Sequence, residues 1–122
     1  MKTIGPDHPI TVAPHAGRVR VTFRGRPVAD SDDVLVLREA AYPPVFYFPR
    51  ADVRMEALAR TDHATYCPYK GHAAYYSLAD GDTVSANAIW TYETPYEQMA
   101  SITDRLAFYP DRVSFEVTPP SS

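Results

Sequence analysis

The sequence lacks most features that mark secreted, membrane-bound and nucleic-acid-binding proteins. It has one cysteine in 122 residues, which excludes an intrachain disulfide and a multi-cysteine zinc site. Its N-terminus has no apolar signal core, and no apolar run approaches the roughly 20 residues of a membrane span. The net charge is −3, so the chain lacks the excess of positive charge that is typical of nucleic-acid-binding proteins. We therefore expect a cytoplasmic protein that binds neither nucleic acid nor a membrane.

Motifs for metals and cofactors are missing as well. His63, Cys67 and His72 lie near one another in the sequence, but their spacing matches no standard zinc motif. The sequence contains no glycine-rich phosphate loop and no pair of aspartates in a metal-binding pattern. We therefore expect no metal and no cofactor.

Proline and tyrosine are the residues that the sequence has in excess. The 12 prolines interrupt regular structure, so the elements should be short, and the 9 tyrosines favour half-buried strands and pocket walls. A chain of this length suffices for one domain with one core. We expect an N-terminal arm over residues 1–17, a single β-rich domain over residues 18–117 and a tail over residues 118–122.

Alternating apolar and polar residues predict most of the strands. Val19, Val21 and Phe23 alternate with arginines, which indicates a strand with one solvated face. Asp80-Gly81 is a tight-turn signal between two alternating segments and predicts a hairpin. Further strands are expected over residues 10–12, 28–29 with 34–37, 45–48, 72–78, 83–92, and 106–109 with 113–117 as a final hairpin.

Two short helices complete the predicted fold. Asp52 can cap a helix over residues 53–59. Thr94 to Glu97 forms a capping box, with Pro95 at the first position of a helix that ends near residue 102. Strands mostly follow one another without helical crossovers, so their pairing should be antiparallel. The expected fold is mainly β: a small, strongly curved antiparallel sheet or partly open barrel with two short helices.

Several segments, taken in their order, resemble a known protein family. They are Glu39, residues 47–53 (YFPRADV), 67–71 (CPYKG), 88–95 (AIWTYETP) and 107–109 (AFY). Together they resemble the bacterial and fungal family known as domain of unknown function four-two-seven, over about residues 18–117. The resemblance implies a compact β-rich domain and implies little about activity. Some classifications give this family a nucleotidyltransferase-like label.

Cys67 and Lys70 are the candidate catalytic residues. A thiolate is a nucleophile, and a nearby ammonium group favours the thiolate. Gly71 permits a tight turn or the close approach of a ligand, and the intervening Pro68 favours a reversal that would bring the lysine back toward the sulfur. The alternative is a buried, inert cysteine with Lys70 paired to a carboxylate. We expect burial to oppose the lysine, so that Cys67 reacts slowly near neutral pH.

Five further residues are candidates for a ligand pocket: Glu39, Tyr47, Arg50, Tyr76 and Trp90. Aromatic walls with a few convergent polar groups are typical of small-molecule sites, and arginine suits a carboxylate or phosphate. Glu39 could orient Lys70 or Arg50. The alternative is structural, with Trp90 in the core and Arg50 paired with Glu39.

These residues leave three functions open. The first is an uncharacterised domain that binds a small polar or anionic molecule in an aromatic-lined pocket. The second is an enzyme that uses Cys67 as its nucleophile, and the third is a protein-interaction module without chemistry. The sequence does not identify the ligand, and it leaves a homodimer open.

Overall fold

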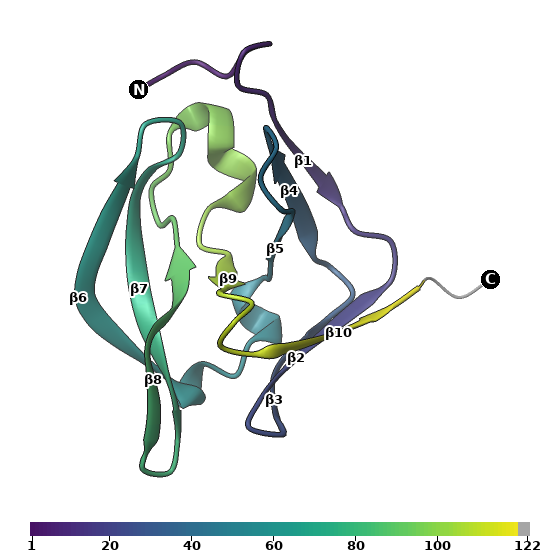
Figure 1. The fold of residues 1–122 in the computed structure, drawn as a ribbon, viewed down its shortest axis with the longest axis vertical. Coiled ribbons are helices and arrows are strands. Elements are labelled where there is room, and N and C mark those ends of the chain that lie inside the picture. The colour runs from purple at the N-terminus through teal and green to yellow at the C-terminus, as the bar shows by residue number, and fades with distance from the viewer. Residues whose placement is uncertain (120–122) are drawn as a thin grey trace.

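The computed structural model describes residues 1–119 and is built mainly of β-strands (Figure 1). The strands form three antiparallel sheets, with the orders β1-β4-β5, β10-β2-β3 and β6-β7-β8-β9. The strand bounds are β1 (Ile10–Pro14), β2 (Arg18–Phe23), β3 (Arg26–Ser31), β4 (Leu35–Glu39), β5 (Val45–Tyr47), β6 (Leu58–Cys67), β7 (Gly71–Asp80), β8 (Thr83–Thr91), β9 (Leu106–Phe108) and β10 (Ser114–Thr118). The prediction of a mainly β, antiparallel fold is confirmed. In the part of the chain that the structure describes, three sheets stand in place of the one strongly curved sheet or partly open barrel that was expected. Within residues 1–119, no helix has the length and apolar character that crossing a membrane requires.

The alternation in β2 places its apolar side chains inside the molecule. Val19, Val21 and Phe23 are buried, whereas Arg18 and Arg20 are exposed. Arg18 Nε donates a hydrogen bond of 2.7 Å to Asp30 on the neighbouring strand β3. The exposed face of this sheet therefore carries paired charges of both signs.

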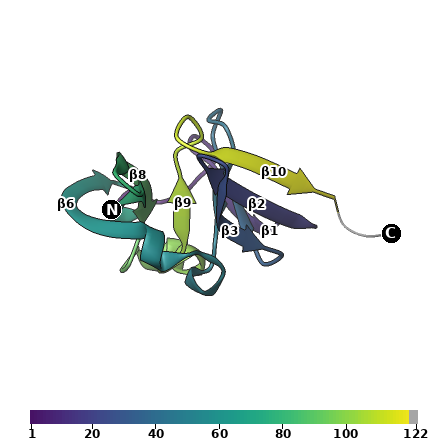
Figure 2. The same cartoon turned by 90° about the horizontal axis from the view of Figure 1, so that it is seen from below.

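One isolated bridge joins two of the sheets. The amide of Phe48, directly after β5, donates to the carbonyl of Leu106 on β9, and the amide of Leu106 donates back, each at 2.9 Å. Successive strand residues face opposite sides, so Phe48 and Leu106 enter one core while Tyr47 and Ala107 enter another. We call these the first core and the second core. Figure 2 shows β9 between β6 and β8 on one side and β2 and β10 on the other.

The helix predicted over residues 53–59 is wrong. Two short 3-10 turns, η1 (Arg50–Asp52) and η2 (Met55–Ala57), lie there, and β6 already begins at Leu58. The Asp52 carboxylate caps no helix and accepts a hydrogen bond of 2.6 Å from the Ser31 hydroxyl. Leu58 pairs with Leu78 of β7, and this tertiary pairing overrides the local helix preference.

The second predicted helix is a 3-10 turn, η3 (Glu97–Ile102), and its predicted cap is wrong. Tyr96 rather than Thr94 is the N-cap residue, and no side chain caps the turn. The Tyr96 amide donates to the carbonyl of Lys70 at 2.9 Å. The segment before η3 is therefore held by the turn that follows β6.

The hairpin predicted at Asp80-Gly81 is confirmed. Asp80 of β7 pairs with Thr83 of β8, and Gly81 opens the turn with a φ of 59°. The predicted final hairpin is wrong, because β9 pairs with β8 while β10 pairs with β2. The predicted two-part strand is also wrong, because its parts belong to β3 and β4 in different sheets.

Two further differences concern the ends of segments. Strand β6 was not predicted, because most of its side chains are exposed and show no apolar alternation. The segment predicted as a tail from residue 118 begins inside β10, and residues 120–122 lie outside the described part of the chain. The predicted arm contains β1, an edge strand that pairs with β4.

Candidate functional site

A cleft of about 640 Å³ opens beside β5 and β8. Most of its lining is apolar and comes from the loop before β5, from β5, β8 and β9, and from β10. These apolar side chains include Pro43, Pro44, Phe46, Trp90, Phe108 and Phe115. The lining also contains Glu39, Cys67 and Lys70, and the phenol of Tyr42. The cleft therefore has apolar walls and one polar end.

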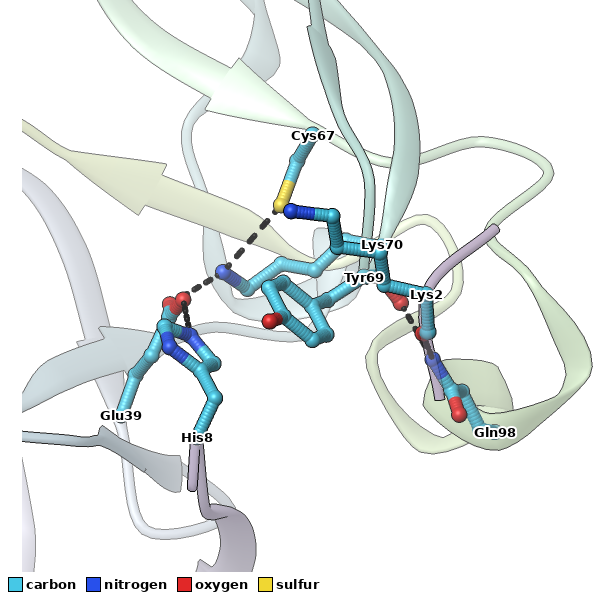
Figure 3. Close-up of polar contacts among 7 residues, drawn as sticks. All are labelled: Lys2, His8, Glu39, Cys67, Tyr69, Lys70 and Gln98. Atoms are coloured by element: carbon cyan, nitrogen blue, oxygen red, sulfur yellow. Dashed lines mark hydrogen bonds and ion pairs between the residues drawn. The ribbon is translucent and has the colours of Figure 1, made fainter. Parts of the chain in front are cut away.

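The turn after β6 brings Cys67 and Lys70 together at this polar end. Cys67 is the last residue of β6, and the Lys70 amide donates to its carbonyl at 3.3 Å. Lys70 Nζ lies 3.9 Å from Cys67 Sγ and donates a hydrogen bond of 2.5 Å to Glu39 Oε1 (Figure 3). The Lys70 side chain is only 9% exposed, so its charge depends on the neighbouring carboxylate for compensation.

Glu39 connects Lys70 to a residue that sequence reasoning missed, His8. Glu39 Oε2 lies 2.7 Å from His8 Nε2, and the imidazole stacks on the Tyr69 ring at 4.1 Å with an interplanar angle of 6°. Burial by itself would raise the pKa of Glu39. The hydrogen bonds from Lys70 and His8 outweigh this effect, so the pKa lies below its usual value. No spacing motif links residues 8 and 39, which meet only because β1 pairs with β4.

Trp90 lines the cleft and Tyr47 lies beneath it. Trp90 Nε1 donates a hydrogen bond of 3.2 Å to the Tyr47 hydroxyl, and the Tyr109 ring packs against the indole at 4.6 Å. Tyr47 is buried in the second core, and this burial raises the pKa of its hydroxyl. Tyr47 therefore supports the wall of the cleft and is not part of its lining.

The structure does not bring Arg50 and Tyr76 to this cleft. Tyr75 and Tyr76 are successive residues of β7, so their side chains face opposite sides of the strand. Tyr75 enters the second core, on which Trp90 packs, whereas Tyr76 enters the first core. There the Tyr76 hydroxyl accepts a hydrogen bond of 3.3 Å from Arg50. Arg50 and Tyr76, two of the candidate pocket residues, are therefore not part of the lining of this cleft.

The two histidines near Cys67 lie against aromatic rings. The His63 ring packs on the edge of Tyr75 at 4.5 Å, and the His72 ring lies 4.9 Å from that of Tyr66. Across residues 1–119, no group of three or more His, Cys, Asp or Glu side chains is arranged to hold a metal ion.

Comparison with known proteins assigns the family. The family model described as a domain of unknown function, DUF427, matches residues 11–118. The chain belongs to the DUF427 family. The family resemblance predicted from the sequence motifs is thus confirmed, and no curated protein matches the chain. Glu39, Cys67, Lys70 and Trp90 lie within the DUF427 match, whereas His8 precedes it.

Proposed function

We propose that this DUF427 domain binds a small molecule with an apolar body and a polar end group. The observation that carries the proposal is the cleft of about 640 Å³, with aromatic and proline walls and with Glu39, Cys67 and Lys70 at one end. Small-molecule sites have this size and this balance of apolar walls and few polar groups. The apolar walls favour an amphipathic ligand over a wholly polar one.

The cleft walls are built from residues with little conformational freedom, which favours a binding site that is already formed in the absence of ligand. Pro43 and Pro44 have restricted backbone angles. The Trp90 ring is held by its hydrogen bond to Tyr47 and by contact with Tyr109. When a ligand binds to a preformed site, less free energy is lost in ordering the side chains of the site. As part of the proposal we place the protein in the cytoplasm, which the free thiol of Cys67 supports.

The neutral fluorescent probe N-phenylnaphthylamine tests the proposal. Trp90 is the only tryptophan and lines the cleft, so its emission should transfer to a bound probe and saturate as the probe is added. The change Pro44→Arg, in an exposed loop of the cleft wall, should weaken binding about tenfold by placing a charge on an apolar surface.

The matched control is Val84→Arg, at an exposed position beside the β7–β8 turn and outside the cleft lining. This variant should bind the probe as the unmodified protein does. An absence of saturable transfer, or an equal loss in both variants, would contradict the proposed binding function.

An enzyme that uses Cys67 as nucleophile is the second candidate function. The observation in its favour is the position of Cys67 Sγ and Lys70 Nζ, 3.9 Å apart at the polar end of one cleft. Against it, the ammonium lies closer to Glu39 than to the sulfur, so most of its charge compensates the carboxylate. We therefore expect an unreactive thiol.

Alkylation by iodoacetamide, followed by mass spectrometry across a range of pH, separates the two candidates. Near neutral pH, Cys67 should react no faster than a small free thiol, and Cys67→Ser should fold and still bind N-phenylnaphthylamine. Rapid alkylation under mildly acidic conditions that becomes slow in Lys70→Met would instead make the enzyme the leading candidate.

A further inference from the structure

Glu39 and Lys70 line the polar end of the cleft, and His8, which is not part of the lining, is hydrogen-bonded to Glu39, so that the three side chains form one chain (Figure 3). Lys70 contacts one oxygen of Glu39, and His8 contacts the other. With a neutral imidazole, the ammonium and the carboxylate cancel and the chain has no net charge. With a protonated imidazole, the chain carries one positive charge. An imidazole changes its charge between about pH 5 and pH 8.

The surroundings of Glu39 favour its charged form. Its pKa lies below the usual value, because hydrogen bonds from Lys70 and His8 outweigh the effect of burial. The groups that face His8 are the Glu39 carboxylate from β4 and the Tyr69 ring from the turn after β6. Across residues 1–119, Glu39 is the only ion-pair partner of His8, and Lys70 contacts the other oxygen of the same carboxylate. The charge of this end therefore follows the proton on His8.

Backbone contacts hold His8 in place. The Ala40 amide donates to the carbonyl of Pro9 at 2.9 Å, directly after Glu39 in the chain. Nearer the N-terminus, the Lys2 amide donates to the carbonyl of Pro68 at 2.7 Å. Gln98 Nε2 donates to the carbonyl of Lys2 at 2.8 Å (Figure 3). The imidazole is 25% exposed, so it can exchange a proton with solvent without leaving Glu39.

Building on the small-molecule binding proposed above, we propose that His8 determines which ligand end group the cleft accepts. When His8 is neutral, Glu39 opposes an anion near Lys70, and the cleft favours an uncharged hydrogen-bonding end such as a carbonyl or hydroxyl. When His8 is protonated, the net positive charge attracts a carboxylate, sulfonate or phosphate end. His8 lies in the N-terminal segment, before residues 11–118 that the family model matches, so the proposed selection of the end group depends on a residue outside that match.

Two probes with the same apolar body isolate the effect of the end group. N-phenylnaphthylamine is uncharged, and anilinonaphthalene sulfonate adds one negative charge to the same ring system. Their dissociation constants are measured by transfer from Trp90 at about pH 5 and about pH 8, either side of the imidazole titration. The sulfonate should bind about tenfold more tightly at the lower pH, while the neutral probe should change less than about twofold.

Three variants identify the responsible group. His8→Phe keeps an aromatic ring on Tyr69 and should remove the pH dependence of sulfonate binding, whereas the matched control His72→Phe should retain it. Glu39→Gln removes the negative charge beside Lys70 and should give tight sulfonate binding at both pH values.

Each alternative result has one meaning. If the neutral probe binds but sulfonate affinity does not change with pH, the role of His8 is wrong and the binding function stands. If the pH effect survives in His8→Phe, another group controls the charge and the inference is overturned. If neither probe binds in the cleft, the proposed function itself fails, and this inference fails with it.

Discussion

Gly71 is the residue that allows the polar end of the cleft to form. It follows Lys70 directly and has a φ of 112°, a conformation that residues with a Cβ rarely adopt. An added Cβ would lie 3.6 Å from Pro95 Cα and from the Tyr96 nitrogen, which is ordinary contact. A larger residue at this position would therefore destabilise the protein through its unfavourable backbone conformation and not through a steric clash.

We expect Gly71→Ala to lower the free energy of unfolding by about 1–3 kcal/mol, because the alanine must adopt an unfavourable φ. Urea denaturation of the variant and of the unmodified protein measures the difference. Gly5→Ala is the matched control, since Gly5 has no positive φ and no neighbouring atom within 4 Å of an added Cβ. Equal effects of the two changes would show that the backbone of Gly71 is not the cause.

At the scale of elements, the N-terminal segment and η3 are coupled through one side chain. Gln98 of η3 donates to the carbonyls of Lys2 and Tyr69, at 2.8 and 2.9 Å, and its oxygen accepts a hydrogen bond from the Ile4 amide at 3.3 Å. A single amide group thus ties residues before β1 to the turn after β6.

Gln98→Ala should therefore release the N-terminal segment and leave the strands intact. We expect faster hydrogen exchange at the Lys2 and Ile4 amides, because local opening no longer breaks these contacts. Glu97→Ala, at the exposed neighbouring position of η3, should leave that exchange unchanged. Uniformly faster exchange in all strands of Gln98→Ala would instead indicate global destabilisation.

Across the whole molecule, local patterns predicted the elements better than their partners. The alternation of β2 and the turn signal at Gly81 are local, and both predictions are confirmed. The pairing of β10 with β2 and the 3-10 turns near Asp52 depend on residues far away in the chain, and both were predicted wrongly. Strand β6 has exposed side chains, so it carries little apolar signal of its own.

In the candidate site, too, local features could be predicted from the sequence and long-range contacts could not. Cys67 and Lys70 are close in sequence, and one turn suffices to bring them together. Glu39 and Trp90 reach the same cleft from other strands. Tyr76 lies elsewhere because successive residues of β7 face opposite sides, and the sequence does not show which side faces the cleft. His8 was missed because only the pairing of β1 with β4 brings it to Glu39.

The pairing of β10 with β2 has a consequence for the order in which the molecule assembles. Ser114 pairs with Thr22, so this contact closes a loop that contains most of the chain. Hairpins such as β7–β8 form within microseconds, whereas contacts between distant segments form more slowly. Phe115 of β10 is part of the cleft wall. During refolding, the hairpin should therefore appear first, and the cleft should gain its last wall only when the final strand docks.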